Sequence, residues 1–487
     1  MPIDIAQLQL QPNGTIALAR QLYQLLHQQI MQGQLTYHER LPATRQLAAT
    51  LNISRGVVVE AYDMLKLDAI VAGFGKGGTR VCVPSTQSPP PDQSKKSHAT
   101  PPKIALSTRG QRIANSRNYP NRSQTREFPL TPSMPDFRLF PLKQWQRVAA
   151  MALNSSPKWY HRDGGLPLLK QQLCTFLAQY RGITNVQPQQ VIITTGSQGA
   201  QSLLATLLCN SGDIALVESP CWTGTVSALK QAGLDIITSP LDNQGMQVPV
   251  NIRHKKQQPK IVITSAAIQF PTGITMTPAR RQALVQATQA WQSWLIEDDY
   301  AAEYSYNHHP PPSILATSRA AHIIHIGTMS KLLMPALRMG WLVVPPALIS
   351  PIVSAMNTLG LQASYLQQQQ LGLFMQYGYL STHLAHCRAV YNFRRKRACD
   401  YLQRYAKGYF SITDSISGMN ISLRLDDRFS DLDSRQLSEH FKQHELGISV
   451  YRFQDCQHLL LGHTLLDDAS YAKELDSFIH AIKTLTA

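Results

Sequence analysis

Long apolar runs are missing from this sequence. Its 487 residues contain no stretch of about 18 uninterrupted apolar residues, which is the length that a membrane-spanning helix needs. The N-terminal stretch MPIDIAQLQLQPNG also lacks the basic and then apolar pattern of a signal peptide. We therefore expect no membrane partner and a soluble, cytoplasmic protein.

Cysteine is scarce and follows no pattern. The seven cysteines are odd in number and nowhere form a CxxC pair, so the sequence predicts neither a disulfide framework nor a zinc site. We expect them to be small buried hydrophobic residues. They are Cys82, Cys174, Cys209, Cys221, Cys387, Cys399 and Cys456.

Acidic residues are few for a chain this basic. Thirty Asp and Glu residues oppose 46 Lys and Arg residues, a formal net charge of +16. This excess favours a polyanionic partner such as nucleic acid, although an acidic membrane surface would satisfy the same charge. The length and the 43% hydrophobic content allow at least two domains.

Aromatic and branched apolar residues are rare between residues 84 and 127. This stretch is rich in Pro, Ser, Gln and Arg, and eight basic residues oppose only Asp92 and Glu127. Such a composition predicts a flexible or semi-extended basic linker, which is either a solvated spacer or a spacer that also contacts phosphates. The sequence thus divides into residues 1–83, 84–127 and 128–487.

Residues 1–83 show three helical patterns. Apolar residues recur at helical spacing from Leu18 to Ile30, which predicts a helix ending near Gly33. TRQLAATL predicts a second short helix, and after the turn NISR a third helix can begin with Ser54 as its cap. The expected inner face of this third helix consists of Val58, Ala61, Tyr62 and Leu65.

A glycine-rich hairpin pattern, IVAGFGKGGTRVCV, follows the third helix and predicts a β-wing. The whole arrangement is that of a winged helix-turn-helix. Arg45 lies at the start of the second helix, Ser54 and Arg55 at the exposed start of the third, and Lys76 at the wing tip. There they would offer hydrogen-bond donors to DNA phosphates and base edges.

The stretch LPATRQLAATLNISRGVVVEAYDMLKLDAIVAGFGKGGTRV resembles the winged helix of GntR-family transcription regulators. The resemblance implies that Arg45 and Arg55 contact DNA and that Lys76 to Gly78 form the wing tip. Gly56 and Val57 stand where the family has a polar residue and a threonine, so the base preference of relatives cannot be transferred.

Six short apolar runs alternate with helical patterns beyond Phe128. The runs are continuous rather than alternating in polarity, as in strands covered on both faces. They predict a large α/β domain with a mostly parallel sheet. The runs are residues 191–195, 214–218, 260–264, 293–298, 322–326 and 340–344.

One lysine stands in the mostly apolar stretch HIGTMSKLLMPALRMGW, directly after a predicted strand. A partly desolvated lysine amine is a useful nucleophile, although Lys331 taken alone would pass for a surface residue. In VIITTGSQGAQSLLATLL, Gly196, Ser197 and Gln198 open a helix that can bind an anion.

WLIEDDY places acids and a tyrosine at a strand end, where open α/β sheets keep their ligand sites. Arg338, seven positions after Lys331, suits a phosphate. Together these features match pyridoxal 5′-phosphate, whose aldehyde bonds to a lysine, whose ring nitrogen is kept protonated by a carboxylate, and whose phosphate needs a helix start and an arginine.

From about Phe128 onward the sequence resembles class I aminotransferases of fold type I. Combined with the winged helix, it resembles the MocR/GabR-type subgroup of GntR regulators. The resemblance implies a large pyridoxal 5′-phosphate domain with a smaller C-terminal α+β subdomain. It also implies a homodimer, because Tyr160 of KWYHRDGGLPLL matches a tyrosine that reaches the partner subunit's cofactor.

The same resemblance implies roles for residues in four further motifs: GTMSKLLMPALRMG, IEDDY, TGSQGA and ESPCWTG. The roles are Lys331 as the Schiff-base residue, Thr328, Ser330, Arg338, Ser197 and Gln198 at the phosphate, Asp298 at the pyridine nitrogen, Tyr300 at the ring hydroxyl, and Trp222 stacked on the ring.

Two departures weaken the expectation of efficient transamination. AIQFPTG has Phe270 where catalytic aminotransferases have an asparagine, and Gln269 could compensate for the lost hydrogen bond. HLLLGHTLL lacks the arginine that usually binds the substrate carboxylate, and Arg424 and Arg452 are nearby in sequence.

Two functions follow from these patterns. The first is a transcription regulator that senses a small amine, an amino acid or a B6 vitamer through a cofactor on Lys331. The second is an active aminotransferase whose DNA-binding segment serves only autoregulation. Whether the protein is an enzyme stays open at this point.

Overall fold

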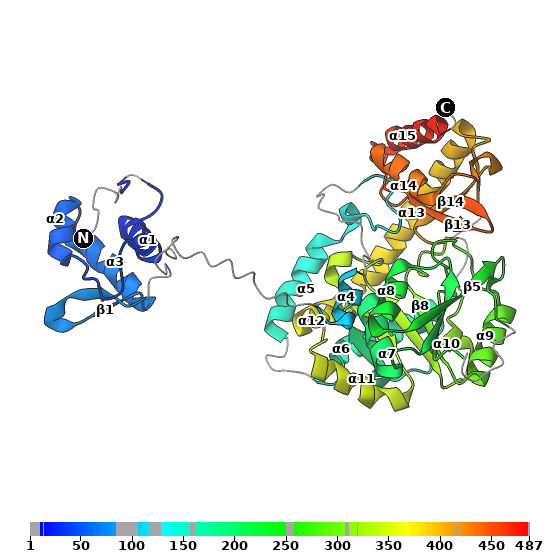
Figure 1. Ribbon diagram of the computed structural model, residues 1–487, viewed down its shortest axis with the longest axis horizontal. Helices are drawn as coiled ribbons and strands as arrows, with labels where there is room; N and C mark the ends of the chain where they lie inside the picture. Colours follow the sequence, from blue (N-terminus) through cyan, green and yellow to red (C-terminus); the bar gives the residue numbers. More distant parts are fainter. Residues whose placement is uncertain are drawn as a thin grey trace, which may run out of the picture. The chain divides into compact units, whose positions relative to one another are not determined.

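The computed structural model describes residues 10–12, 14–83, 106–115, 128–155, 162–249, 258–306, 311–318, 320–413 and 417–485. They belong to two compact units, Met1–Ile104 and Ala105–Ala487, which are drawn in Figure 1 and described separately below. No helix within these ranges is long and apolar enough to cross a membrane.

The first unit is a winged helix-turn-helix. Its three helices and its hairpin agree with the predicted elements, and a 3₁₀ turn at Gly75–Gly77 forms the wing tip. The two short strands pair antiparallel. The elements are α1 (Leu18–Met31), α2 (Thr44–Thr50), α3 (Arg55–Leu67), β1 (Val71–Gly73) and β2 (Thr79–Val81).

The predicted inner face of α3 forms the core of this unit. Val58, Ala61, Tyr62 and Leu65 are all buried, and they pack against apolar residues of α1 and α2. Ser54 accepts a hydrogen bond from the Val57 amide and so caps α3. The prediction is therefore confirmed at both the cap and the core.

An eight-stranded sheet forms the centre of the second unit, with strand order β3-β10-β9-β8-β7-β4-β5-β6. The neighbours from β9 to β5 are parallel, whereas β10 is antiparallel to both β3 and β9. The strands are β3 (Val191–Thr194), β4 (Ile214–Ser219), β5 (Asp235–Asp242), β6 (Gly245–Met246), β7 (Ile261–Thr264), β8 (Trp294–Asp299), β9 (Ile323–Thr328) and β10 (Gly340–Val343).

All six predicted strands are present. The sequence did not predict β5, because it lies near the sheet edge and half of its positions are exposed, so it lacks a continuous apolar run. Apolar residues of α7, α8 and α11 contact one face of the sheet, and those of α6 contact the other. These helices are α6 (Pro167–Arg181), α7 (Ser197–Leu208), α8 (Thr223–Ala232) and α11 (Pro346–Leu359).

A smaller α+β subdomain follows, drawn in orange and red in Figure 1. Its four strands form an antiparallel sheet of order β11-β12-β14-β13, which packs on helices through its own apolar cluster. The elements are β11 (Phe410–Ile412), β12 (Asn420–Leu425), β13 (Ser449–Phe453), β14 (Cys456–Gly462), α14 (Ser434–Gln443) and α15 (Tyr471–Thr484).

The remaining helices of the second unit connect these layers. The longest of them, α13, begins beside the large sheet and ends under the small one, since its residues contribute to both apolar clusters. They are α5 (Leu142–Ser155), α9 (Pro278–Ala290), α10 (Ile314–Thr317), α12 (Tyr365–Gln376) and α13 (Tyr379–Tyr405).

The predicted flexible linker is wrong over one segment. Residues Thr108–Asn115 form a helix, α4, because Ser107 accepts a hydrogen bond from the Gly110 amide at its start and the helix lies against α8. The rest of the linker, residues 84–105 and 116–127, lies outside the described residues.

The expectation of buried cysteines is also largely wrong. None of the seven forms a disulfide, and only Cys387 is fully buried. Several of the others stand at the ends of elements, as Cys209 does after α7 and Cys221 does after β4, where a side chain is covered on one side only.

Candidate functional site

One edge of the large sheet gathers the predicted cofactor residues. Because β4, β7, β8 and β9 are parallel, their C-terminal ends meet there. Gly340 pairs with both Thr194 and Thr328, so the loop after β3 and the lysine loop after β9 lie at the same edge. The ends of β3, β8 and β9 therefore bring three predicted residues to this edge: Ser197, Asp298 and Lys331.

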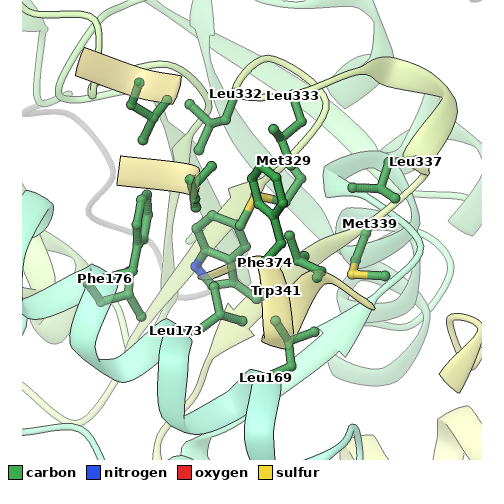
Figure 2. Close-up of a cluster of buried hydrophobic side chains, with 14 of the residues drawn as sticks. Leu169, Leu173, Phe176, Met329, Leu332, Leu333, Leu337, Met339, Trp341 and Phe374 are labelled. Atoms are coloured by element: carbon green, nitrogen blue, oxygen red, sulfur yellow. The ribbon is translucent and has the colours of Figure 1, made fainter. Parts of the chain in front are cut away.

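The lysine loop is anchored by its apolar neighbours. Met329, Leu332 and Leu333 are at most 2% exposed and belong to the cluster around Trp341 and Phe374, which Figure 2 shows beneath the loop. Lys331 itself is half-buried, and its Nζ donates a hydrogen bond to the carbonyl oxygen of Ser133 at 2.8 Å. The apolar residues anchor the loop, and the Ser133 carbonyl binds the amine.

Asp298 is a buried carboxylate with one oxygen lacking a donor. Its Oδ2 accepts a hydrogen bond of 2.7 Å from Gln201 Nε2 on α7, whereas Oδ1 has no partner among the described residues. Burial, and then the charge of Asp299, raise the pKa of Asp298 to about 7. A protonated ring nitrogen facing Oδ1 would supply the missing donor, so the site fits a pyridinium.

Tyr300 follows Asp298 at the end of the strand. Burial and then the charges of Asp298 and Glu218 raise the pKa of the Tyr300 phenol, so it stays protonated and can donate. The Phe270 ring stands edge-on to it at 6.1 Å between centroids. Tyr300 is therefore held as a neutral donor, as a ligand oxygen at this edge would need.

The candidate phosphate site lies at the start of α7, directly after a glycine. Gly196 has φ +93°, and a Cβ there would meet nothing within 4 Å, so the space in front of the first amides of α7 is open. None of the described side chains caps α7, and Ser197 and Gln198 are half-buried at its start. Such a helix start is suited to an anion.

Three further predicted phosphate residues lie around the lysine. Thr328 is buried, and its hydroxyl accepts a hydrogen bond from the Ser330 amide at 3.2 Å, so it stabilises the turn that leads to the lysine. Arg338 is exposed and stands two residues before β10 in a left-handed conformation, φ +49°. Thr328 is thus the last residue of β9, and Ser330 and Arg338 lie in the loop between β9 and β10 that carries Lys331.

Trp222 stands at the start of α8 and is half-buried. A Cβ on Gly224 would come within 2.4 Å of the Trp222 ring, so only glycine lets the ring lie this close to the helix. This contact fixes the ring at the same sheet edge, as a stacking residue requires.

The expectation that Gln269 could compensate for Phe270 is wrong. Its Nε2 donates to Glu218 Oε2 and to the carbonyls of Pro220 and Phe270, and its Oε1 accepts from both Thr272 donors. The side chain is 2% exposed. Because both ends of the amide already have protein partners, Gln269 cannot also serve a ring hydroxyl.

Both arginines near the C-terminal motif have partners within the small subdomain. Arg424 contacts Asp427 and Cys456, and Arg452 donates to the Asp455 carbonyl. The motif itself supplies His463, which is fully buried with no hydrogen-bond partner on either ring nitrogen within the described ranges. Burial and then Arg395 lower the pKa of His463 to about 3, so it stays neutral.

Sequence patterns missed two side chains of this edge. Gln201 lies on the buried face of α7 and bonds to Asp298. Glu218 is the next-to-last residue of β4 and accepts from Thr264 Oγ1 at 2.6 Å. Each is a polar residue at a position where the pattern expects an apolar one, and that mismatch was the available signal.

The predicted DNA-contacting residues Arg45, Ser54 and Arg55 are all exposed at the starts of α2 and α3. The side chain of Lys76 and the whole of Tyr160 lie outside what the structure describes. The predictions for these two residues are therefore untested.

Two family models match this chain. Bacterial regulatory proteins of the gntR family match residues 18–81, and Aminotransferase class I and II matches residues 134–454. The first covers the winged helix, and the second covers the large sheet together with most of the small subdomain.

Several full-length regulators are similar to this chain. The probable rhizopine catabolism regulatory protein MocR of Rhizobium meliloti is 30% identical over 85% of this chain and 82% of its own. The regulator TauR of Rhodobacter capsulatus is 30% identical over 81% and 82%. The pyridoxine biosynthesis regulator PdxR of Corynebacterium glutamicum is 27% identical over 81% and 80%.

Solved structures show the same fold in the second unit. Kynurenine aminotransferase of Pyrococcus horikoshii matches with a TM-score of 0.66 and 24% identity, over 79% of this chain and 96% of that one. The α-aminoadipate aminotransferase LysN of Thermus thermophilus matches with 0.65 and 22%, over 78% and 96%. The chain belongs to the MocR-type regulators of the GntR family, in which a winged helix-turn-helix is fused to a class I and II aminotransferase domain.

Proposed function

We propose that this protein is a pyridoxal 5′-phosphate-dependent transcription regulator that binds an operator and senses a small amine, an amino acid or a B6 vitamer. The observation that carries the proposal is the buried Asp298 Oδ1 without a donor, at the edge where Lys331 also lies. The names of MocR, TauR and PdxR connect these relatives with regulation, and for PdxR with pyridoxine biosynthesis.

The residues of the sheet edge divide the work of holding the cofactor. When bound, pyridoxal phosphate supplies an aldehyde that bonds to an amine and a ring that withdraws electrons. Lys331 Nζ would hold the aldehyde, and Asp298 Oδ1 would hold the ring nitrogen proton. Phosphate binding would fall to Ser197, Gln198, Thr328, Ser330 and Arg338, ring stacking to Trp222, and the ring hydroxyl to Tyr300.

DNA binding would use the exposed starts of α2 and α3. Arg45, Ser54 and Arg55, with Lys76 on the wing, would contact phosphates and base edges in the major groove. A homodimer, to which Tyr160 would contribute across the interface, would place two winged helices on two half-sites. A protein that binds bacterial DNA would be located in the cytoplasm.

Regulation requires a difference in affinity. A ligand changes the arrangement of the DNA-binding units only if it binds one arrangement better than the other. The edge around Lys331 is suited to this, because an amine can compete with Lys331 for the cofactor aldehyde. The weak provision for a ligand carboxylate, with His463 neutral, favours sensing over turnover.

Footprinting of the purified protein on the DNA upstream of its own gene tests this proposal. We expect protection of two half-sites, with a protection pattern that changes when pyridoxal phosphate and a panel of amines are added. Absence of sequence-specific protection at every salt concentration, with or without cofactor, would contradict it.

A second candidate is an active aminotransferase, which the full set of cofactor residues favours. Lys331 Nζ would then take the proton from the substrate Cα once the substrate amine has displaced it from the cofactor. Stopped-flow absorbance with a panel of amino acids separates the two. Repeated conversion of the cofactor to its amine form, with release of keto acid, favours the enzyme, and a single stalled step favours the sensor.

The Lys331→Ala substitution tests the residue on which both candidates depend. We expect the cofactor to lose its covalent attachment completely, because no other amine lies in the anchored loop. Absorbance in the near-visible range and borohydride trapping followed by peptide mapping measure this loss. A trapped peptide that still forms in the variant would contradict the assignment.

A further inference from the structure

We propose that the Ser133 carbonyl is the resting acceptor of the Lys331 amine when that amine is not bonded to the cofactor, and that Asn420 is the positioning residue that fixes Ser133. Residues 128–139, here called the entry segment, would thereby respond to the chemical state of Lys331. This inference rests on the proposed function.

Ser133 is bonded on three sides. Its carbonyl accepts from Lys331 Nζ at 2.8 Å, its amide donates to Asn420 Oδ1 at 2.6 Å, and its hydroxyl accepts from Asn420 Nδ2 at 2.9 Å. It is 5% exposed and has φ +55°, a conformation that a residue with a side chain adopts uncommonly. The paired bonds from Asn420 stabilise this conformation, which aims the carbonyl at the lysine.

Asn420 and Lys331 belong to different subdomains. Asn420 is the first residue of β12 and pairs with Gly462 of β14 in the small sheet, whereas Lys331 follows β9 of the large sheet. Ser133 therefore connects the two sheets through a single residue.

The entry segment is bonded to the small subdomain at several other points. Gly462 donates to the Leu130 carbonyl at 2.8 Å, and Gly447 donates to the Pro129 carbonyl at 3.0 Å. A Cβ on Gly462 would stand 2.0 Å from the Thr131 carbonyl oxygen, so this close approach requires glycine. These bonds keep the segment on the small sheet whether or not the lysine contact exists.

Asp136 secures the far end of the segment. It pairs with Arg394 of α13 at 2.7 Å and with Arg138 at 2.8 Å, and its amide donates to the Tyr391 hydroxyl at 2.9 Å. Burial alone would raise the pKa of Asp136. The hydrogen bonds from Arg138 and Arg394 outweigh this effect and hold that pKa below its ordinary value. Both ends of the segment are thus held by residues that do not bond to the cofactor, whereas the contact at Ser133 depends on the Lys331 amine.

Condensation of Lys331 Nζ with an aldehyde, with loss of water, would take the amine off the Ser133 carbonyl. An amine ligand that forms its own imine with the same carbon would release Lys331 as the free amine, which could then return to Ser133. This one hydrogen bond between the two subdomains would therefore be made or lost with the state of the lysine.

Cofactor uptake by the full-length protein tests the inference. The Asn420→Ala substitution removes both hydrogen bonds that fix the conformation of Ser133. The Ser133 carbonyl is then no longer oriented toward Lys331. We expect pyridoxal phosphate to attach about three- to tenfold faster at pH 7, the range that loss of one hydrogen bond allows, with the half-maximal rate at a lower pH. Stopped-flow absorbance, with borohydride trapping at Lys331, measures both quantities.

Two further variants separate positioning from a general structural effect. Asn420→Asp keeps an acceptor for the Ser133 amide and brings a negative charge near the amine, so the half-maximal rate should move to a higher pH. Ser422→Ala lies two residues along the same strand and removes a hydrogen bond to Tyr451 without touching Ser133, so its uptake should match the wild type. Circular dichroism verifies that each variant folds.

Opposite pH shifts in the two Asn420 variants, with Ser422→Ala unchanged, support the inference. If both Asn420 variants follow the wild-type pH profile while the wild type attaches the cofactor normally, the inference is overturned and the proposed function stands. If the wild type attaches no cofactor at Lys331, the proposed function itself fails.

Discussion

Strand β8 places carboxylates on both faces of the large sheet. The carboxylates on the two faces differ in how many of their oxygens have protein partners. Glu297 accepts from Ser313 Oγ and the Ile314 amide, and Asp299 pairs with the buried Arg181 of α6. On the opposite face, Asp298 receives one donor, Gln201 of α7, and its other oxygen receives none from the described residues.

The pKa values follow this difference. Although burial raises it, His325, Arg181 and Ser313 bring the pKa of Glu297 down to about 2, whereas the pKa of its neighbour Asp298 rises to about 7. Both side chains are buried, so the number of donors and cations decides. A buried acid whose partners are complete serves the fold, and one whose partners are incomplete indicates a ligand.

Asp299→Asn tests the face on which the carboxylates have protein partners. It should have the largest effect on stability. It leaves the Arg181 guanidinium, which is 1% exposed, without its charged partner, at a cost of about 3–5 kcal/mol in the free energy of unfolding. Urea denaturation of the cofactor-free protein measures this. A loss below about 1 kcal/mol would remove the distinction between the two faces.

Asp298→Asn tests the other face and should change stability in the opposite direction. The folded pKa of about 7 lies above the ordinary value, so the stability that Asp298 contributes is present below about pH 4 and is lost as pH rises toward 7. Asparagine cannot ionise, so the cofactor-free variant should be more stable than the wild type at pH 8 and no different at pH 4.

The same Asp298→Asn variant should hold pyridoxal phosphate more weakly, by about tenfold or more, because a neutral amide replaces the charged acceptor of the ring proton. Equilibrium dialysis compares the two proteins. A variant that gains stability at pH 8 and still binds the cofactor as tightly as the wild type would show that Asp298 does not face the ring.

In the other unit, the expected effect is confined to DNA binding. Arg55 is exposed at the start of α3, so Arg55→Ala should leave folding and cofactor uptake unchanged and weaken operator binding by about 1–3 kcal/mol if it reads a base. Fluorescence anisotropy with operator DNA and scrambled DNA measures this. Equal weakening on both DNAs would limit Arg55 to a phosphate contact.

The sequence predicted elements and sites that depend on neighbours along the chain. The core of α3 and its Ser54 cap follow from helical spacing, and the six strands of the sheet follow from continuous apolar runs. Lys331 and Asp298 could be selected because each lies in a short motif at a strand end.

Features that depend on distant residues could not be predicted. Ser133 and Asn420 are 287 positions apart, and no periodicity connects them. The role of Gln269 was misjudged because its partners on Glu218 and Pro220 come from another strand and loop. Helix α4 was missed because its stability comes from a serine cap and from α8, and not from its own composition.

The docking of α4 on α8 also sets the reach of the winged helix. Thr108 is 25 positions after Val83, and a fully extended chain of that length spans at most about 90 Å, whereas the 45 positions to Phe128 would span about 160 Å. The docked helix α4 therefore attaches the chain to the second unit 20 positions before Phe128. In the proposed homodimer, this shorter reach would raise the local concentration of one operator half-site around the second winged helix once the first is bound.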